Sequence, residues 1–178
     1  YSNPRDFRRA LEDRIQQISK TEKVDIPNLR RQIAFDRLLS RLFSVEPSPW
    51  VLKGGYAMQL RTPFARTTKD VDLSIRDGKL FSKDSKTQSS AIRDLLREKA
   101  ETNFNDFFTF IISDPIKDLD AAPYGGSRFH VEARVDDRPF EKFHLDIGIG
   151  DIWIEPIENL TVRGWLEFAG ITARTYPS

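Results

Sequence analysis

Two segments of alternating apolar residues, separated by a short polar turn, constrain the fold of this chain more than any other feature. Apolar residues occupy every second position from Phe129 to Val135, and again from Phe143 to Ile149. Side chains alternate between the two faces of a β-strand, so each segment predicts a strand with one buried face. The polar residues Asp136 to Pro139 predict the turn of a β-hairpin between them.

The remaining pattern predicts an α+β fold. Apolar residues recur at helical spacing after Pro4 and again after Pro27, where Ser2 and Asn3 can cap the first helix. Strands are predicted at residues 50–52, 71–75, 107–112 and 171–176. A short helix is predicted at 56–61, a longer helix at 92–100 and a polar loop at 79–90. Helices come first and strands mixed with helices follow, which favours a mixed or antiparallel twisted sheet flanked by N-terminal helices. We expect one domain over 1–178, with a helical part at 1–48 and a catalytic core at 49–178.

Composition excludes several classes of protein. The chain has 178 residues, no cysteine and two histidines, which rules out a disulfide framework and any cysteine-based zinc site. The net charge of +1 gives no sign of a nucleic-acid partner, so such a partner would need a local basic patch. No apolar run approaches the length of a membrane span. We therefore expect a cytoplasmic protein with no membrane partner.

Three aspartates are predicted to converge. Val71 and Leu73 share one face of their strand, so Asp70 and Asp72 project together from the other. Asp146 lies on the polar face of the second hairpin strand, among apolar neighbours. If the two strands are adjacent, the three carboxylates meet at one place, and we interpret His130 and His144 as surface residues of the hairpin rather than as metal ligands.

Clustered carboxylates repel one another unless a cation is present. Mg²⁺, or Mn²⁺ in its place, suits such a cluster because it prefers oxygen ligands and accepts phosphate oxygens from a substrate. Asp70 and Asp72 are the expected metal ligands. Asp146 is expected to hold the ion near an attacking hydroxyl and to help remove its proton. All three are therefore candidate catalytic residues.

A glycine pair precedes these acids. Gly54 and Gly55 follow a predicted strand and open a short helix, a position at which backbone N–H groups can approach phosphate oxygens. Nearby cations are candidate partners for a triphosphate or an RNA backbone: Lys53, Arg61, Arg66 and Lys69. Each motif alone is also typical of an ordinary turn or a solvated strand. Their combination in this order is more specific, and neither a P-loop nor a serine-hydrolase motif accompanies it.

The two motifs resemble those of a known family. The segments LKGGYAMQLR and ARTTKDVDLSI, together with FHLDIGIGD, resemble the AbiEii/AbiGii toxins, nucleotidyltransferase-like proteins of type IV toxin–antitoxin and phage-defence systems that include the MenT toxins. The family pattern is matched by Lys53, Gly54, Gly55, Arg61, Arg66, Thr68, Asp70 and Asp72, with Asp146 as the third acid. The resemblance implies a core of the DNA polymerase β type.

The resemblance also implies an activity. Characterised relatives transfer nucleotides from a nucleoside triphosphate to the 3′ end of tRNA with magnesium, which blocks aminoacylation and translation, and a cognate antitoxin restrains them. Family members continue into a helical half with a lysine-bearing helix. We expect this half to be absent here, because the sequence stops at Ser178.

Two alternatives remain open on the sequence. The same site would serve a small-molecule nucleotidyltransferase of the antibiotic-modifying kind, although the basic residues between Arg61 and Lys69 favour RNA as the acceptor. A truncated, non-catalytic module that binds an antitoxin is the other alternative.

Overall fold

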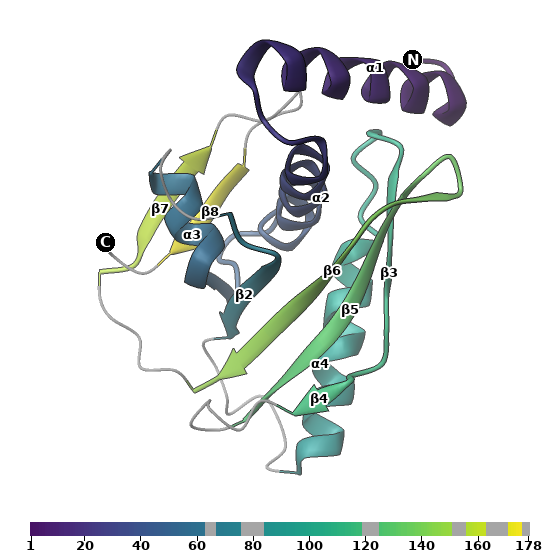
Figure 1. The fold of residues 1–178 in the computed structure, drawn as a ribbon. Coiled ribbons are helices and arrows are strands. Elements are labelled where there is room, and N and C mark those ends of the chain that lie inside the picture. The colour runs from purple at the N-terminus through teal and green to yellow at the C-terminus, as the bar shows by residue number, and fades with distance from the viewer. Residues whose placement is uncertain (63–66, 76–83, 119–124, 151–155, 163–170, 176–178) are drawn as a thin grey trace.

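The chain folds into a mixed β-sheet with helices packed against it (Figure 1). The structure is a computed structural model, and it describes residues 1–62, 67–75, 84–118, 125–150, 156–162 and 171–175. The helices are α1 (Pro4–Glu22), α2 (Ile26–Leu42), α3 (Gly54–Arg61) and α4 (Ser85–Ala100). The strands are β1 (Trp50–Lys53), β2 (Asp70–Ile75), β3 (Phe108–Ile112), β4 (Lys117–Asp118), β5 (Gly126–Val135), β6 (Arg138–Ile149), β7 (Glu158–Val162) and β8 (Ile171–Thr175).

The strand order places the two predicted acid-bearing strands side by side. Across the described part of the sheet the order is β3-β5-β6-β2-β1-β8-β7, and β4 pairs with β5. The pairs β2–β6 and β1–β8 are parallel, whereas β1–β2, β3–β5, β5–β6 and β7–β8 are antiparallel. This arrangement confirms the predicted α+β class with a mixed sheet.

Helices α1 and α2 supply much of the core. Asn3 caps α1 as predicted, because its side chain accepts a hydrogen bond from the Asp6 N–H at 2.9 Å. Asp25 caps α2 in the same way. Phe35 of α2 makes edge-to-face contacts with Tyr56 of α3 and Phe143 of β6, each with ring centroids 4.8 Å apart. Such contacts add to the burial of apolar area and fix α2 against both α3 and the sheet.

The predicted hairpin is present as β5 and β6. Asp136 and Asp137 at its turn both have positive φ, 56° and 53°, as a tight two-residue hairpin turn requires. Arg8 of α1 donates hydrogen bonds to the carbonyl oxygens of Val135 and Pro139 at 2.7 and 2.9 Å. Figure 1 shows α1 lying across this end of the hairpin. The N-terminal helix therefore holds the turn end of the two longest strands.

A buried ion pair joins α2 to the segment before β3. The Arg41 guanidinium donates to both carboxylate oxygens of Asp106 at 2.7 and 3.1 Å, and Arg37 lies 3.6 Å from the same carboxylate. The three side chains are at most 5% exposed. Charges at this depth are tolerated only when they are paired, so the cluster fixes the position of β3 relative to α2.

The starts of helices α3 and α4 differ from the sequence prediction. The predicted loop over 79–90 is wrong in its second half, because α4 begins at Ser85 with Asp84 as its cap. The glycine pair, predicted as a turn before a helix at Tyr56, forms the first residues of α3 itself. Among the described helices, none combines the length and the apolar character needed to cross a membrane.

Candidate active site

Four charged residues form a row across four adjacent strands. In the strand registers, Lys53 of β1 lies opposite Asp72 of β2, Asp72 lies opposite Asp146 of β6, and Asp146 lies opposite Arg128 of β5. Directly opposite residues in a sheet share a face, so these side chains gather on the same side. The predicted convergence of Asp72 and Asp146 is therefore present in the backbone register, with a cation at each end of the row.

A second polar row lies beside the first. Asp70 of β2 is opposite His144 of β6, which is opposite His130 of β5. The His144 Nδ1 and Asp70 Oδ1 atoms are 3.2 Å apart, and the two imidazole rings lie 4.7 Å apart between centroids. His144 thus contacts a predicted catalytic carboxylate, a contact that sequence reasoning did not assign to it.

The environment of Asp72 disfavours its charged form. Burial raises the pKa of the Asp72 carboxyl above its ordinary value, and the negative charge of Asp146 raises this pKa further. The opposing influence of Lys53 lowers the pKa of Asp72. A carboxylate in this position is stabilised by additional positive charge, which is the electrostatic condition that a divalent cation meets.

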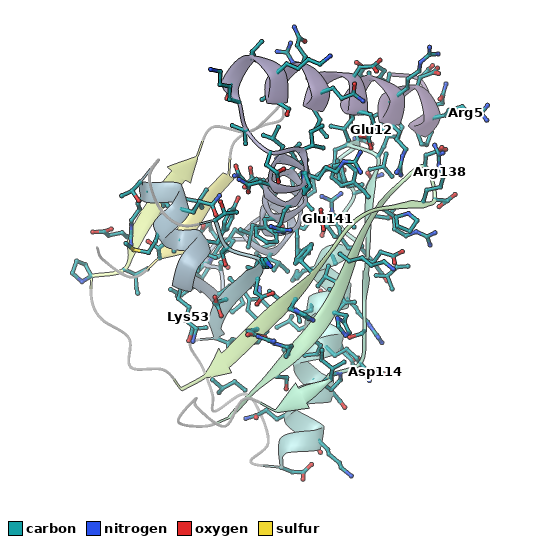
Figure 2. All side chains as sticks on the ribbon, in the orientation of Figure 1. Arg5, Glu12, Lys53, Asp114, Arg138 and Glu141 are labelled. Atoms are coloured by element: carbon teal, nitrogen blue, oxygen red, sulfur yellow. The ribbon has the colours of Figure 1, made fainter. Side chains whose placement is uncertain are left out.

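The backbone at Gly54 and Gly55 passes so close to Asp72 and Thr68 that it leaves little room for a Cβ atom. Gly54 has φ +70°, a conformation that other residues rarely adopt, and a Cβ atom added to it would stand 2.3 Å from Asp72 Oδ2. A Cβ on Gly55 would stand 3.1 Å from Thr68 Oγ1. The first residue of α3, Gly54, therefore lies directly against Asp72. Figure 2 shows the labelled Lys53 at the same junction between β1 and α3.

Helix α2 anchors the start of α3, which contains the glycine pair. Tyr56, which follows the glycine pair, donates its hydroxyl hydrogen bond to the Asp36 carboxylate of α2. Both side chains are buried, and Asp36 Oδ2 has no hydrogen-bond partner among the described residues. Burial raises the pKa of Asp36 to about 6, while the hydrogen bond from Tyr56 lowers it. The start of α3 is therefore fixed to the core through a polar contact.

The other predicted substrate-binding residues have different surroundings. Thr68 donates to the backbone carbonyl of Asp70 at 3.1 Å and so supports the start of β2. The Arg61 guanidinium pairs with Glu158 of β7 at 2.9 Å and also contacts Thr175 of β8, so the structure directs it toward the β7–β8 edge. Lys69 is exposed beside Asp70. Arg66 lies outside the described residues.

A basic depression adjoins the carboxylates. It has a volume of about 590 Å³ and includes Asp70 in its lining. Its other charged or titratable lining residues are Arg31, Lys69, Arg128, Lys142, His130 and His144. Four permanent cations line it with one carboxylate, and two of them have acidic partners, Arg128 in Asp146 and Lys142 in Glu132. With Arg31 and Lys69 as the other two, this part of the surface is suited to a polyanion although the whole chain is nearly neutral.

Arg128 is the main site residue that the sequence analysis missed. Its Nε and a terminal nitrogen each donate to one oxygen of Asp146 at 2.7 Å, and that terminal nitrogen lies 3.8 Å from Asp70 Oδ2. The hydrogen bonds from Arg128 to Asp146 raise the pKa of the guanidinium above its ordinary value. The alternation of apolar residues in the hairpin places Arg128 on the same polar face as Asp146, and this pattern could have identified it as a site residue.

The donor set suits magnesium by the type of its atoms. Asp70, Asp72 and Asp146 offer only oxygen atoms, and the register sets them on neighbouring strands of one face. In the part of the chain that the structure describes, no group of three or more histidine or acidic side chains has the arrangement of a formed metal site. Both oxygens of Asp146 are directed to Arg128 instead.

Comparison with solved structures finds matches at low sequence identity. The crystal structure of JHP933 from Helicobacter pylori is 17% identical with a TM-score of 0.49, and the match covers 86% of this chain and 53% of that one. A second H. pylori protein, proposed to be a nucleotidyltransferase, is 20% identical with a TM-score of 0.48, covering 86% and 55%. This chain thus spans about half the length of these proteins. None of the curated proteins compared with it matches.

The comparison with family models gives a clear assignment. Residues 37–178 match the model described as nucleotidyl transferase AbiEii toxin, type IV TA system. The match includes the glycine turn, the three aspartates and Arg128, and it extends over well more than half of the chain. The chain therefore belongs to the AbiEii nucleotidyltransferase toxin family of type IV toxin–antitoxin systems.

Proposed function

We propose that this chain is a magnesium-dependent nucleotidyltransferase that transfers nucleotides from a nucleoside triphosphate to the 3′ end of tRNA and so inhibits translation. The observation that carries the proposal is the register of β2 and β6, which sets Asp72 opposite Asp146 with Asp70 on the same face. This trio lies against a glycine turn at the start of α3, in a chain of the AbiEii family.

Each residue has a role in this reaction. The oxygen of the acceptor hydroxyl bonds to the α-phosphorus, the α–β phosphoanhydride bond breaks, and pyrophosphate leaves. Asp70, Asp72 and Asp146 would hold Mg²⁺, which supplies positive charge to the transferred phosphate and to the leaving pyrophosphate. Asp146 takes the hydroxyl proton. Lys53 and the N–H groups of Gly54 and Gly55 bind phosphate oxygens of the triphosphate.

The basic depression favours RNA as the acceptor. Lys69 and Lys142 line it together with Arg31 and Arg128, next to Asp70. An RNA strand carries a phosphate at every nucleotide, so four cations beside the attacking hydroxyl would bind the strand as it enters the site. The paired rings of His130 and His144 offer a surface on which a base can stack.

Two other functions make different use of the same site. A small-molecule nucleotidyltransferase would use the three carboxylates but would not need cations along an acceptor strand. A non-catalytic module would bind an antitoxin without transferring a nucleotide. Membership of a toxin–antitoxin family implies an antitoxin partner for the toxin in either case.

The proposal is tested by nucleotide transfer. The purified chain is incubated with Mg²⁺, bulk tRNA and each of the four nucleoside triphosphates labelled at the α-phosphate, and label is measured on tRNA. We expect label to enter tRNA from at least one triphosphate. Mn²⁺ is expected to replace Mg²⁺, and excess EDTA to stop the transfer. The variant Asp72→Asn, which keeps the size of the side chain, is expected to give no label while unfolding at a similar temperature.

The controls separate the three functions. Periodate oxidation removes the 3′ hydroxyl of tRNA, so oxidised tRNA should accept no label if transfer occurs at that hydroxyl. Labelling of an aminoglycoside or another hydroxyl-bearing drug in preference to tRNA would favour the small-molecule enzyme. Absence of transfer to every acceptor, together with tight binding of the antitoxin, would favour the non-catalytic module. Undiminished transfer by Asp72→Asn would overturn the assignment of the carboxylates.

A further inference from the structure

Arg128 makes direct contact with a predicted catalytic carboxylate. Its planar guanidinium forms a two-pronged pair with Asp146, both hydrogen bonds measuring 2.7 Å. Paired bonds of this kind are stronger and more directional than single contacts between a cation and a carboxylate. The Asp146 side chain is only 13% exposed, so water screens the pair little on its acidic side.

The pair determines the direction of the Asp146 carboxylate. Both of its oxygens are turned toward β5, where Arg128 lies opposite Asp146 in the strand register. Asp72, the other acid of the row, lies on the opposite side of Asp146, on β2. A divalent ion shared by these acids needs Asp146 to direct an oxygen toward β2. Binding of that ion and the two-pronged pair therefore make conflicting demands on one side chain.

The guanidinium also supplies positive charge to two of the three acids. One terminal nitrogen lies 2.7 Å from Asp146 and 3.8 Å from Asp70. A second cation in contact with the same two acids would lie close to Arg128. Like charges at so short a separation repel each other strongly at the effective dielectric constant of a protein surface, which is well below that of water.

We propose that Arg128 is an internal counter-cation that competes with the divalent ion for Asp146, and that it releases this carboxylate when the site is loaded. The inference rests on the proposed function, because it takes the three aspartates as metal ligands. The released side chain has a defined destination. Arg128 lines the basic depression with Lys69 and Lys142, so its guanidinium can turn from Asp146 to a phosphate of the acceptor strand.

If Arg128 had a different role, as a residue that orients a metal ligand, its loss would change the metal affinity in the opposite direction. A residue that orients a metal ligand through a hydrogen bond strengthens metal binding, and its loss typically weakens metal affinity about tenfold or more. A competitor weakens metal binding, and its loss strengthens it. The direction of the change in metal affinity therefore distinguishes the two roles.

The test is a measurement of metal binding without nucleotide or RNA. Free Mn²⁺ is followed by electron paramagnetic resonance as it is titrated with the wild-type chain, with Arg128→Gln and with Arg128→Lys. We expect Arg128→Gln to bind Mn²⁺ at least about tenfold more tightly. A tenfold change in affinity corresponds to about 1.4 kcal/mol. Loss of the competing hydrogen bonds to the charged Asp146 is sufficient to account for a change of this size. Arg128→Lys, which keeps the charge but not the two-pronged geometry, should fall between the two.

A matched control and a second readout keep the test decisive. Arg134→Gln removes an arginine of the same strand that pairs with Glu132 instead, and it should leave Mn²⁺ affinity unchanged. Should Arg128→Gln fail to fold, titration of the wild-type chain with Mg²⁺ replaces it. The Nε–H resonance of Arg128, assigned with the Arg128→Lys spectrum, should then shift toward that of a solvated arginine as Mg²⁺ saturates the site.

The outcomes separate this inference from the proposed function. Unchanged or weaker Mn²⁺ binding by Arg128→Gln, or an Arg128 resonance that does not respond to Mg²⁺, overturns the inference and leaves nucleotide transfer intact. Tighter Mn²⁺ binding without any transfer to tRNA supports the inference and overturns the proposed acceptor. Absence of Mn²⁺ binding by every variant overturns both the inference and the magnesium site.

Discussion

Gly54 and Asp72 are in such close proximity that one additional carbon atom on Gly54 would overlap the acid. A Cβ at this position would stand 2.3 Å from Asp72 Oδ2 and 2.9 Å from Asp72 Cγ. The glycine pair and the acidic strand β2, which are separated by residues 56–69 in the sequence, therefore form one packed unit. Lys53 extends this unit, because it lies opposite Asp72 in the β1–β2 register.

Replacement of Gly54 by alanine is expected to displace Asp72 and to reduce nucleotide transfer at least about a hundredfold, as small displacements of catalytic groups do. The positive φ should also cost about 1–2 kcal/mol in the free energy of unfolding. Gly125→Ala is a suitable control. Gly125 has φ +85°, but among the described residues its added Cβ would meet only Gln88 Oε1, at an ordinary 3.4 Å. A similar loss of transfer in both variants would show that backbone strain, and not the overlap with Asp72, is responsible.

The faces of the strands could be predicted from the sequence, but the register could not. Alternation alone placed Asp70, Asp72 and Asp146 on polar faces. At the hairpin turn Val135 pairs with Arg138, and continuing this pairing without interruption would set Ser127 opposite Asp146. An irregularity between Ala133 and Arg134 shifts the pairing by one residue, so that Arg128 takes this place. Alternation restricts the partner of Asp146 to the polar face of β5, but the position of the bulge, which has no strong sequence signal, decides that this partner is Arg128.

Long-range contacts of two other segments could not be read from the sequence. The charge of Arg61 and its place near the glycine pair predict that it binds a phosphate, and this stays a prediction. In the structure its partner is Glu158 of β7, a residue 97 positions later in the chain. The start of α4 at Ser85 was missed because the polar residues of its first turns resemble a loop, although Asp84 supplies a cap through Thr87 at 2.9 Å.

Removal of the buried carboxylate at position 106 is expected to destabilise the fold strongly. Asp106→Ala would leave Arg41, whose side chain is 1% exposed, with an uncompensated charge. The loss of one partner from a buried ion pair typically costs about 3–5 kcal/mol, and we expect a decrease of this size in the free energy of unfolding measured with urea.

Asp114→Ala provides the contrast for this experiment. Asp114 also pairs with an arginine, Arg93, at 2.9 Å, but its side chain is 75% exposed. Solvent screens such a pair, so the variant should unfold at nearly the same urea concentration as the wild type. Equal effects of the two substitutions would contradict the view that burial gives the Asp106 pair its importance.

Reversal of charge in the basic depression is expected to weaken RNA binding. Lys69→Glu and Lys142→Glu each place a carboxylate beside the path proposed for the acceptor strand. We expect each to lower the affinity for a short fluorescein-labelled single-stranded RNA, measured by anisotropy in EDTA, by about tenfold. The plot of log affinity against log salt should become shallower by about 0.7 for each RNA phosphate that the variant no longer neutralises.

Lys20→Glu serves as the control for these variants. Lys20 is an exposed lysine in the last turn of α1, outside the residues that line the depression. It changes the net charge by the same amount and should change RNA affinity little. An equal loss of affinity in all three variants would indicate that overall charge, and not the depression, determines RNA binding.

The buried carboxyl of Asp36 should make the stability of the protein depend on pH in a defined direction. Its pKa is raised from 3.8 to about 6 in the folded state, with burial as the main cause. The folded state therefore holds the proton more tightly than the unfolded state does. The resulting stabilisation is complete below about pH 4 and is lost as the pH rises through 6, and for a shift of this size it amounts to about 3 kcal/mol.

Asp36→Asn isolates this contribution, because the amide oxygen can still accept the hydrogen bond from Tyr56 but cannot ionise. The difference in free energy of unfolding between wild type and variant, measured by urea denaturation at a series of pH values, should shift in favour of the variant between about pH 4 and pH 7. The wild type loses the stabilisation over this range and the variant does not. A difference that stays constant with pH would show that Asp36 has the same pKa in both states. The same denaturation curves for Tyr56→Phe should retain the pH dependence, because the carboxyl remains buried when the hydroxyl is removed.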